Sequence, residues 1–154
     1  MARKPAARVP RPSSDSPSLT SVGFLLHLCQ ARLRDGVVAA IDGSGLHPGQ
    51  LAVLGAIADR GNMSQRRLGD VTQIEKSSMV LFLDALEAGG WVRRLPDPED
   101  RRAHLVSLTA DGARKFAALG VRLGEMQKRF LAPLDEDERQ LLVDLLIRLS
   151  AREA

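Results

Sequence analysis

The chain of 154 residues contains no tyrosine, one tryptophan and four phenylalanines. Modes of single-strand or RNA recognition that stack bases on aromatic rings therefore lose support. A single cysteine cannot form an internal disulfide, which fits a reducing compartment. No apolar run approaches the ~18 residues that a bilayer span needs. We therefore expect a cytoplasmic protein that does not interact with membranes.

Patterns typical of catalysis or metal binding are also missing. His27, His47 and His104 form no i, i+4 pair, and no cysteine cluster accompanies them. A zinc ion bridging His27, Asp42 and His47 is an open alternative, but otherwise we expect no metal and no cofactor. No Ser-His-Asp or Cys-His arrangement is readable from the spacing. The sequence therefore predicts that the protein is not an enzyme.

The excess of positive charge lies at the start of the chain. Residues 1–17 hold four basic side chains and one acidic one, which accounts for the whole net charge of +3. Residues 1–18 are also rich in proline, serine and alanine, so we expect a disordered basic tail. Such a tail could follow DNA phosphates or could simply keep the protein soluble. The remainder is electrically neutral, so DNA binding has to be argued from how the charges are arranged.

From residue 19 onward, apolar residues recur at helical spacing and turn signals separate the segments. The predicted helices cover about 19–41 and 48–60, a short segment from Ser64 to a turn at 72–74, about 75–88, a long segment from Thr109 to before Pro133, and a segment that starts at Asp135 and contains Leu149. The predicted strands cover Trp91–Leu95 and Ala103–Leu108. Ser64, Thr109 and Asp135 stand where a helix N-cap is expected. Two short helices followed by a charged hairpin indicate a helix-turn-helix with a wing, a device for holding duplex DNA.

The predicted fold is mainly α with a small β-hairpin wing, as a winged helix-turn-helix lobe plus an α-helical dimerisation region. The first, fifth and sixth helices carry more apolar surface than the small central lobe can cover. The residues that show this surplus most plainly are Leu26, Leu33, Leu123, Leu142 and Leu146. A homodimer would bury these stripes against each other across a two-fold axis.

Two stretches carry a resemblance to a known family. Asp100-Arg101-Arg102 is followed five residues later by Leu108-Thr109, and Leu46-His47-Pro48-Gly49-Gln50 opens the second helix. In these features the chain resembles the MarR family of bacterial transcriptional regulators. The resemblance implies a MarR-like domain over 19–152, with a winged helix-turn-helix at 46–109 and dimerisation helices at 19–41 and 110–152. It also implies a homodimer that represses promoters at palindromic operators, often relieved by a small organic acid.

The residues expected to contact DNA lie on the helix-turn-helix and on the hairpin. They are Ser64, Gln65, Lys76, Ser77, Ser78, Val80, Leu81, Arg94, Arg101 and Arg102. The resemblance implies that Asp100 pairs with an arginine and fixes the wing, but it does not assign effector-binding residues. Val80, Leu81 and Gln73 stand where relatives commonly carry a small hydroxyl residue, an arginine and a glycine. Apolar side chains in the groove can touch thymine methyls, although one of Val80 and Leu81 could instead pack inward.

Two other functions remain open on the sequence alone. The neutral body, with apolar Val80 and Leu81 on the predicted recognition helix, would suit a protein-interaction adaptor without affinity for DNA. A redox-switched regulator acting through Cys29 is the other alternative. Because Cys29 lies on the apolar stripe of its helix, we expect a buried thiol that does not react.

Overall fold

The computed structural model describes residues 21–98 and 104–150, so the predicted tail at 1–18 lies outside the described residues. The elements follow the predicted order. They are α1 (Val22–Ile41), α2 (Pro48–Arg60), β1 (Met63–Ser64), α3 (Gln65–Thr72), α4 (Lys76–Ala88), β2 (Val92–Pro96), β3 (His104–Leu108), α5 (Ala110–Phe130) and α6 (Glu136–Ser150). The predicted fold class, mainly α with a small β wing, is confirmed.

Local capping chemistry explains where the helices begin. The hydroxyls of Ser64 and Thr109 accept hydrogen bonds from the backbone N–H groups of α3 and α5, as their N-cap positions predict. Asp135 and Glu138 form a reciprocal capping box for α6, with backbone-to-carboxylate distances of 3.0 and 2.9 Å. Pro48 occupies the first turn of α2, where a missing N–H costs nothing.

The sheet has three antiparallel strands in the order β1-β3-β2. In the hairpin, Arg94 pairs with Val106, and Pro96 pairs with His104. The sequence predicted this hairpin but not β1, which adds Met63 and Ser64 to the other edge of β3. A strand of two residues is too short to show an alternating pattern, so periodicity could not reveal it.

The buried core belongs to the winged lobe. It joins α2, α3, α4 and the sheet through fully buried side chains such as Leu54, Leu68 and Leu83. Along α2 the core face is Val53, Leu54 and Ile57, whereas Leu51 is only half-buried. This core fixes α3 and α4 against each other, which is what a helix-turn-helix requires.

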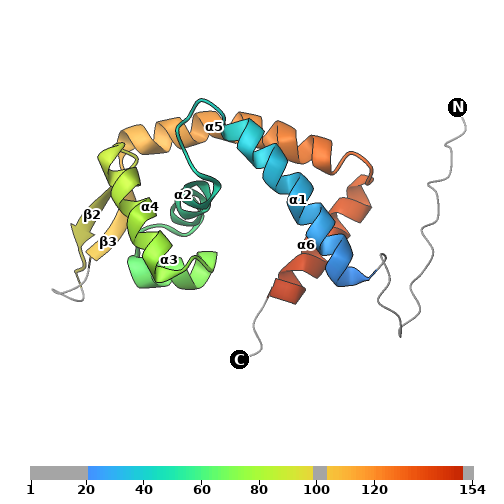
Figure 1. Ribbon diagram of the computed structural model, residues 1–154, viewed down its shortest axis with the longest axis horizontal. Coiled ribbons are helices and arrows are strands. Elements are labelled where there is room, and N and C mark those ends of the chain that lie inside the picture. The colour runs from blue at the N-terminus through green and yellow to red at the C-terminus, as the bar shows by residue number, and fades with distance from the viewer. Residues whose placement is uncertain (1–20, 99–103, 151–154) are drawn as a thin grey trace, which may run out of the picture.

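The helical base contrasts with this lobe. Figure 1 shows α5 running along one edge of the molecule from the hairpin to α6, with α1 beside its C-terminal half. No residue of α6 is buried, and in α1 only Ala40 and Ile41 are. Leu149 and Val22 are 73 % and 66 % exposed. Of the residues expected to show the apolar surplus, Leu26 and Leu146 are exposed in a single chain, whereas Leu33, Leu123 and Leu142 are half-buried.

The expectation that Cys29 is buried is wrong for the single chain. The thiol is exposed, because nothing within the described residues covers the N-terminal half of α1. His27, Asp42 and His47 are likewise not brought together as a metal site, since the described residues hold no group of three or more His, Cys, Asp or Glu able to bind an ion. Within residues 21–98 and 104–150, no helix is long and apolar enough to cross a membrane.

Candidate DNA-binding interface

The helix-turn-helix depends on a tight turn between α3 and α4. Gln73 ends α3 with φ of 57°, and it is the one non-glycine residue of positive φ in the described ranges. Its backbone N–H donates to the Gly69 carbonyl and its side-chain amide donates to the Asp70 carbonyl, at 2.9 and 2.5 Å. A left-handed residue at this point explains why a glycine would suit the turn.

The recognition helix α4 presents an exposed face of mixed character. Lys76 and Ser77 are exposed in its first turn, and Ser78 is half-buried. Val80 and Leu81 are 38 % and 69 % exposed, so the alternative in which one of them packs inward is wrong. The opposite face, with Met79, Leu83 and Leu86, is buried. The exposed face is thus apolar in its middle and polar at its N-terminal end.

The preceding helix α3 places further polar groups beside α4. The Ser64 hydroxyl accepts from the Arg67 backbone N–H at 3.3 Å, so it caps α3. A cavity of about 550 Å³ is lined by α3, the turn and the start of α4, with Gln65 and Arg66 on one side and Lys76 on the other. The sequence prediction missed Arg66. Its signal was a basic residue two positions after the capping Ser64, in the first turn of a helix next to the recognition helix.

Arg94 does not stand free on the wing. One guanidinium nitrogen lies 2.6 Å from the Asp84 carboxylate, and the other contacts the Glu87 carboxylate. The Arg94 backbone N–H also donates to Glu87, at 3.1 Å. The side-chain hydrogen bond to Asp84 raises the pKa of the Arg94 guanidinium above its ordinary value, against the opposing effect of burial. These contacts tie β2 to α4, a role that the sequence prediction of a DNA contact did not include.

The tip of the hairpin carries the remaining predicted contacts. Asp100, Arg101 and Arg102 lie outside the described residues, so their predicted roles stay predictions. The strands that lead to the tip are described. Val92 is buried at the root of the hairpin, and exposed Arg93 lies on the same strand.

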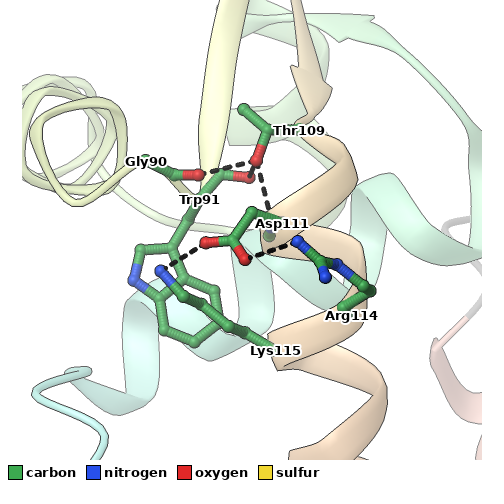
Figure 2. Close-up of polar contacts among 7 residues, drawn as sticks. Gly90, Trp91, Thr109, Asp111, Arg114 and Lys115 are labelled. Atoms are coloured by element: carbon green, nitrogen blue, oxygen red, sulfur yellow. Dashed lines mark hydrogen bonds and ion pairs between the residues drawn. The ribbon is translucent and has the colours of Figure 1, made fainter.

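Thr109 and Gly112 form the junction between the wing and α5. Figure 2 shows Thr109 beside Gly90 and Trp91. The Thr109 hydroxyl donates to the Gly90 carbonyl at 2.6 Å and accepts from the Gly112 N–H at 2.8 Å. A Cβ on Gly112 would lie 2.0 Å from the Trp91 carbonyl oxygen. The Leu108-Thr109 signal in the sequence therefore marks the point where α5 is fastened to the start of β2.

A charged cluster next to this junction completes the contact. Lys115 lies 2.7 Å from the Asp111 carboxylate and 5.3 Å from the centre of the Trp91 ring, and Arg114 contacts Asp111 at 3.1 Å. The hydrogen bond from Lys115 lowers the pKa of the Asp111 carboxyl. Asp111 also stands in the first turn of α5, where a negative charge is favoured.

Comparisons with known proteins agree with this geometry. A sequence model of the MarR family matches residues 44–103. The transcriptional regulator HosA of Escherichia coli O111:H- is 34 % identical over 101 residues, which span 65 % of this chain and 74 % of HosA. A mutant MarR from Escherichia coli in complex with operator DNA superimposes with a TM-score of 0.74 at 26 % identity, over 84 % of this chain and 94 % of that one.

In a third similar protein, a small molecule regulates DNA binding. BpsR of Bordetella bronchiseptica, whose DNA binding is regulated by 6-hydroxynicotinic acid, has a TM-score of 0.79 at 26 % identity, over 93 % of this chain and all of that one. The chain belongs to the MarR family and is a DNA-binding transcriptional regulator with a winged helix-turn-helix. Members of this family are transcription factors without catalytic activity.

Proposed function

We propose that the protein is a cytoplasmic, homodimeric repressor that binds a palindromic operator and is released from it by a small organic acid. The observation that carries this proposal is the exposed face of α4, which is held beside a wing anchored by Arg94 to Asp84 and Glu87. In this arrangement α4 enters the major groove and the hairpin reaches the neighbouring minor groove. Residues 46–109 then form the DNA-binding unit, while 19–41 and 110–152 form the dimerisation helices.

The DNA contacts divide into two kinds. Lys76, Ser77 and Gln65 lie at helix N-termini, where side chains and backbone N–H groups can hold phosphates. Arg66 extends this set by its place on the same cavity as Lys76. Ser64, Ser78 and Val80 add contacts near the groove, and one of Arg101 and Arg102 reaches the minor groove, where the potential is most negative.

Leu81 is the residue proposed to read sequence. It is the most exposed large apolar residue of α4, and an apolar side chain recognises a thymine methyl without discriminating guanine by hydrogen bonds. Specificity would then depend partly on the shape of the DNA.

Leu81→Arg should raise the affinity for every duplex, because it adds a positive charge that can pair with DNA phosphates. The ratio of the affinity for operator to the affinity for random DNA should fall. Fragments selected from the organism's own DNA with the wild-type protein supply the operator. Fluorescence anisotropy at two salt concentrations then compares operator with scrambled duplex for both proteins. An unchanged specificity ratio would show that Leu81 does not face the bases.

The homodimer follows from the apolar surface that a single chain leaves uncovered on α1 and α6. The side chains involved include Val22, Leu25, Leu26, Leu28, Leu145, Leu146 and Leu149. Leaving this many large apolar groups in water costs more than a soluble monomer of this size ordinarily bears. With two-fold symmetry the half-sites of the operator would be centred about 10 bp apart.

Sedimentation of the intact chain should give twice the 16.7 kDa monomer mass at micromolar concentration. Leu146→Lys combined with Leu149→Lys should shift the protein towards monomers or aggregates, because two charges would enter the apolar interface. Leu81→Lys is the matched control. It changes a leucine outside the proposed interface that is about as exposed as Leu149, at 69 % against 73 %, and this variant should remain dimeric. A stable wild-type monomer would contradict the proposal.

A further inference from the structure

The recognition helix α4 has a second support besides the buried core, at the N-terminus of α2. Phe82, which is half-buried on α4, stacks on the ring of His47, with 5.0 Å between the ring centres and 27° between the ring planes. His47 is the N-cap residue of α2, and α2 and α4 lie side by side (Figure 1). Neither ring belongs to the cluster of fully buried side chains, so this contact holds α4 separately from the core.

Gly49 lets the Phe82 ring lie directly on the backbone of α2. A Cβ on Gly49 would come within 2.8 Å of two atoms of that ring, Cε2 and Cζ, so a larger residue would displace the ring. Ser78 lies one turn before Phe82 on the same side of α4, and Leu81 is the direct neighbour of Phe82. A shift of the Phe82 ring would therefore move the surface of α4 that is proposed to meet the DNA.

His47 is held at the start of α2 by two hydrogen bonds. The Gly49 backbone N–H donates to His47 Nδ1 at 3.0 Å, and the His47 backbone N–H donates to Gln50 Oε1 at 2.8 Å. A ring nitrogen that accepts a hydrogen bond carries no proton, so the ring in this arrangement is neutral, with its proton on Nε2. Protonation of Nδ1 removes this acceptor and places a positive charge at the positive end of the α2 dipole.

The imidazole of His47 has no ion-pair partner in the described part of the chain. The charged residues on α2, on α4 and in the segments just before them are Asp42, Asp59, Arg60, Glu75, Lys76, Asp84 and Glu87. The His47 ring is exposed, so it exchanges protons with water. The face of Phe82 would still attract a protonated ring, but the Gly49 N–H would no longer fix the position of that ring. The bond to Gly49 is thus present at high pH and is lost when the imidazole gains a proton.

We propose that His47 is a positioning residue for DNA binding. Its neutral imidazole caps α2 and holds Phe82, and it thereby sets the orientation of α4 in the major groove. Protonation releases the ring from Gly49 and lets Phe82 and α4 shift, so the affinity for DNA should fall at low pH. A histidine that faced the phosphates would have the opposite effect, because its added charge would raise the affinity. The inference rests on the proposed docking of α4 in the major groove.

The test measures binding of the intact protein to an operator fragment selected from the organism's own DNA. Fluorescence anisotropy at constant salt follows the affinity from about pH 8 to about pH 5.5, the range in which imidazoles gain their proton. The wild type should lose affinity about fivefold, the size expected for the loss of one N-cap. His47→Asn should bind as tightly as the wild type at pH ~8 and should not show this fall, because its side-chain oxygen replaces Nδ1 as an acceptor that does not titrate.

His47→Gln places its amide one bond further from the backbone, where it does not cap the helix. This variant should bind about fivefold more weakly than the wild type at both ends of the pH range. If His47 only packs against Phe82, the Asn and Gln variants, which both lack the ring, should be equally weak. That result would overturn the proposal, as would an equal fall of affinity with pH in the wild type and in His47→Asn.

His104→Gln is the matched control, because His104 is an exposed histidine at the start of β3 in the wing. Its affinity should fall at low pH at least as steeply as that of the wild type. An affinity that stays constant or rises at low pH in both proteins would contradict the role of His47. If the wild type binds no duplex at pH ~8, the proposed function fails as well. A wild type that binds DNA with the wrong pH profile refutes the role of His47 alone.

Discussion

Gly112→Ala is expected to destabilise the fold by about 3 kcal/mol or more. The added methyl group would meet the Trp91 carbonyl oxygen at 2.0 Å, and the Trp91 Cα and carbonyl carbon lie within 2.8 Å of the same point. These are backbone atoms that cannot rotate away. Either α5 would separate from the start of β2 or Thr109 would lose its bonds to Gly90 and Gly112. Thermal or urea unfolding followed by circular dichroism measures the effect.

Gly120→Ala is the matched control for this experiment. Gly120 lies two turns further along α5 and has no atom within 4 Å of its would-be Cβ. The same substitution there should be neutral or stabilising by up to about 1 kcal/mol, because alanine is the better helix former. Near-equal stability of the two variants would mean that the Thr109–Gly112 junction does not hold the wing against α5.

Arg94→Gln is expected to weaken DNA binding about tenfold or more at low salt, because the wing would lose its anchor and two carboxylates on α4 would face the duplex unpaired. Unfolding should become easier by only about 1 kcal/mol, since Asp84 is largely exposed. Glu87→Gln should also lower the folding stability. If Arg94 acts through Glu87, the loss of folding stability in the double variant should be smaller than the sum of the losses in the two single variants.

Arg93→Gln is the matched control, as Arg93 is an exposed arginine on the same strand without an ion pair in the described residues. Its folding stability should equal that of the wild type. One other result for Arg94→Gln would instead support the direct DNA contact predicted from sequence. In that case stability would be unchanged, and the salt slope of binding would fall by about one unit.

The sequence predicted the order of elements and most helix bounds, because capping residues and glycines act locally. Ser64, Thr109 and Asp135 are read from their own neighbourhoods, and the structure places each at a helix start. The outward direction of Leu81 followed from helical periodicity in the same way. Sequence patterns were sufficient wherever a residue's structural role depends on residues within one helical turn of it.

The features that the sequence did not reveal depend on contacts between distant segments. Arg94 meets Asp84 and Glu87 only because the hairpin folds back on α4, and no spacing rule covers ten residues across a turn. Cys29 lies on an apolar stripe, but a stripe does not say whether the same chain covers it. Tertiary pairing decides these features.

A salt titration tests the central claim most directly. The intact protein is titrated into a random duplex of about 30 bp, long enough for two half-sites about 10 bp apart, at a series of salt concentrations. A winged helix that holds phosphates should bind with an affinity that falls linearly on a log–log plot, with a slope of about −0.9 for each phosphate contact. Undetectable binding at low salt, or an affinity independent of salt, would contradict the account and favour a protein-interaction adaptor.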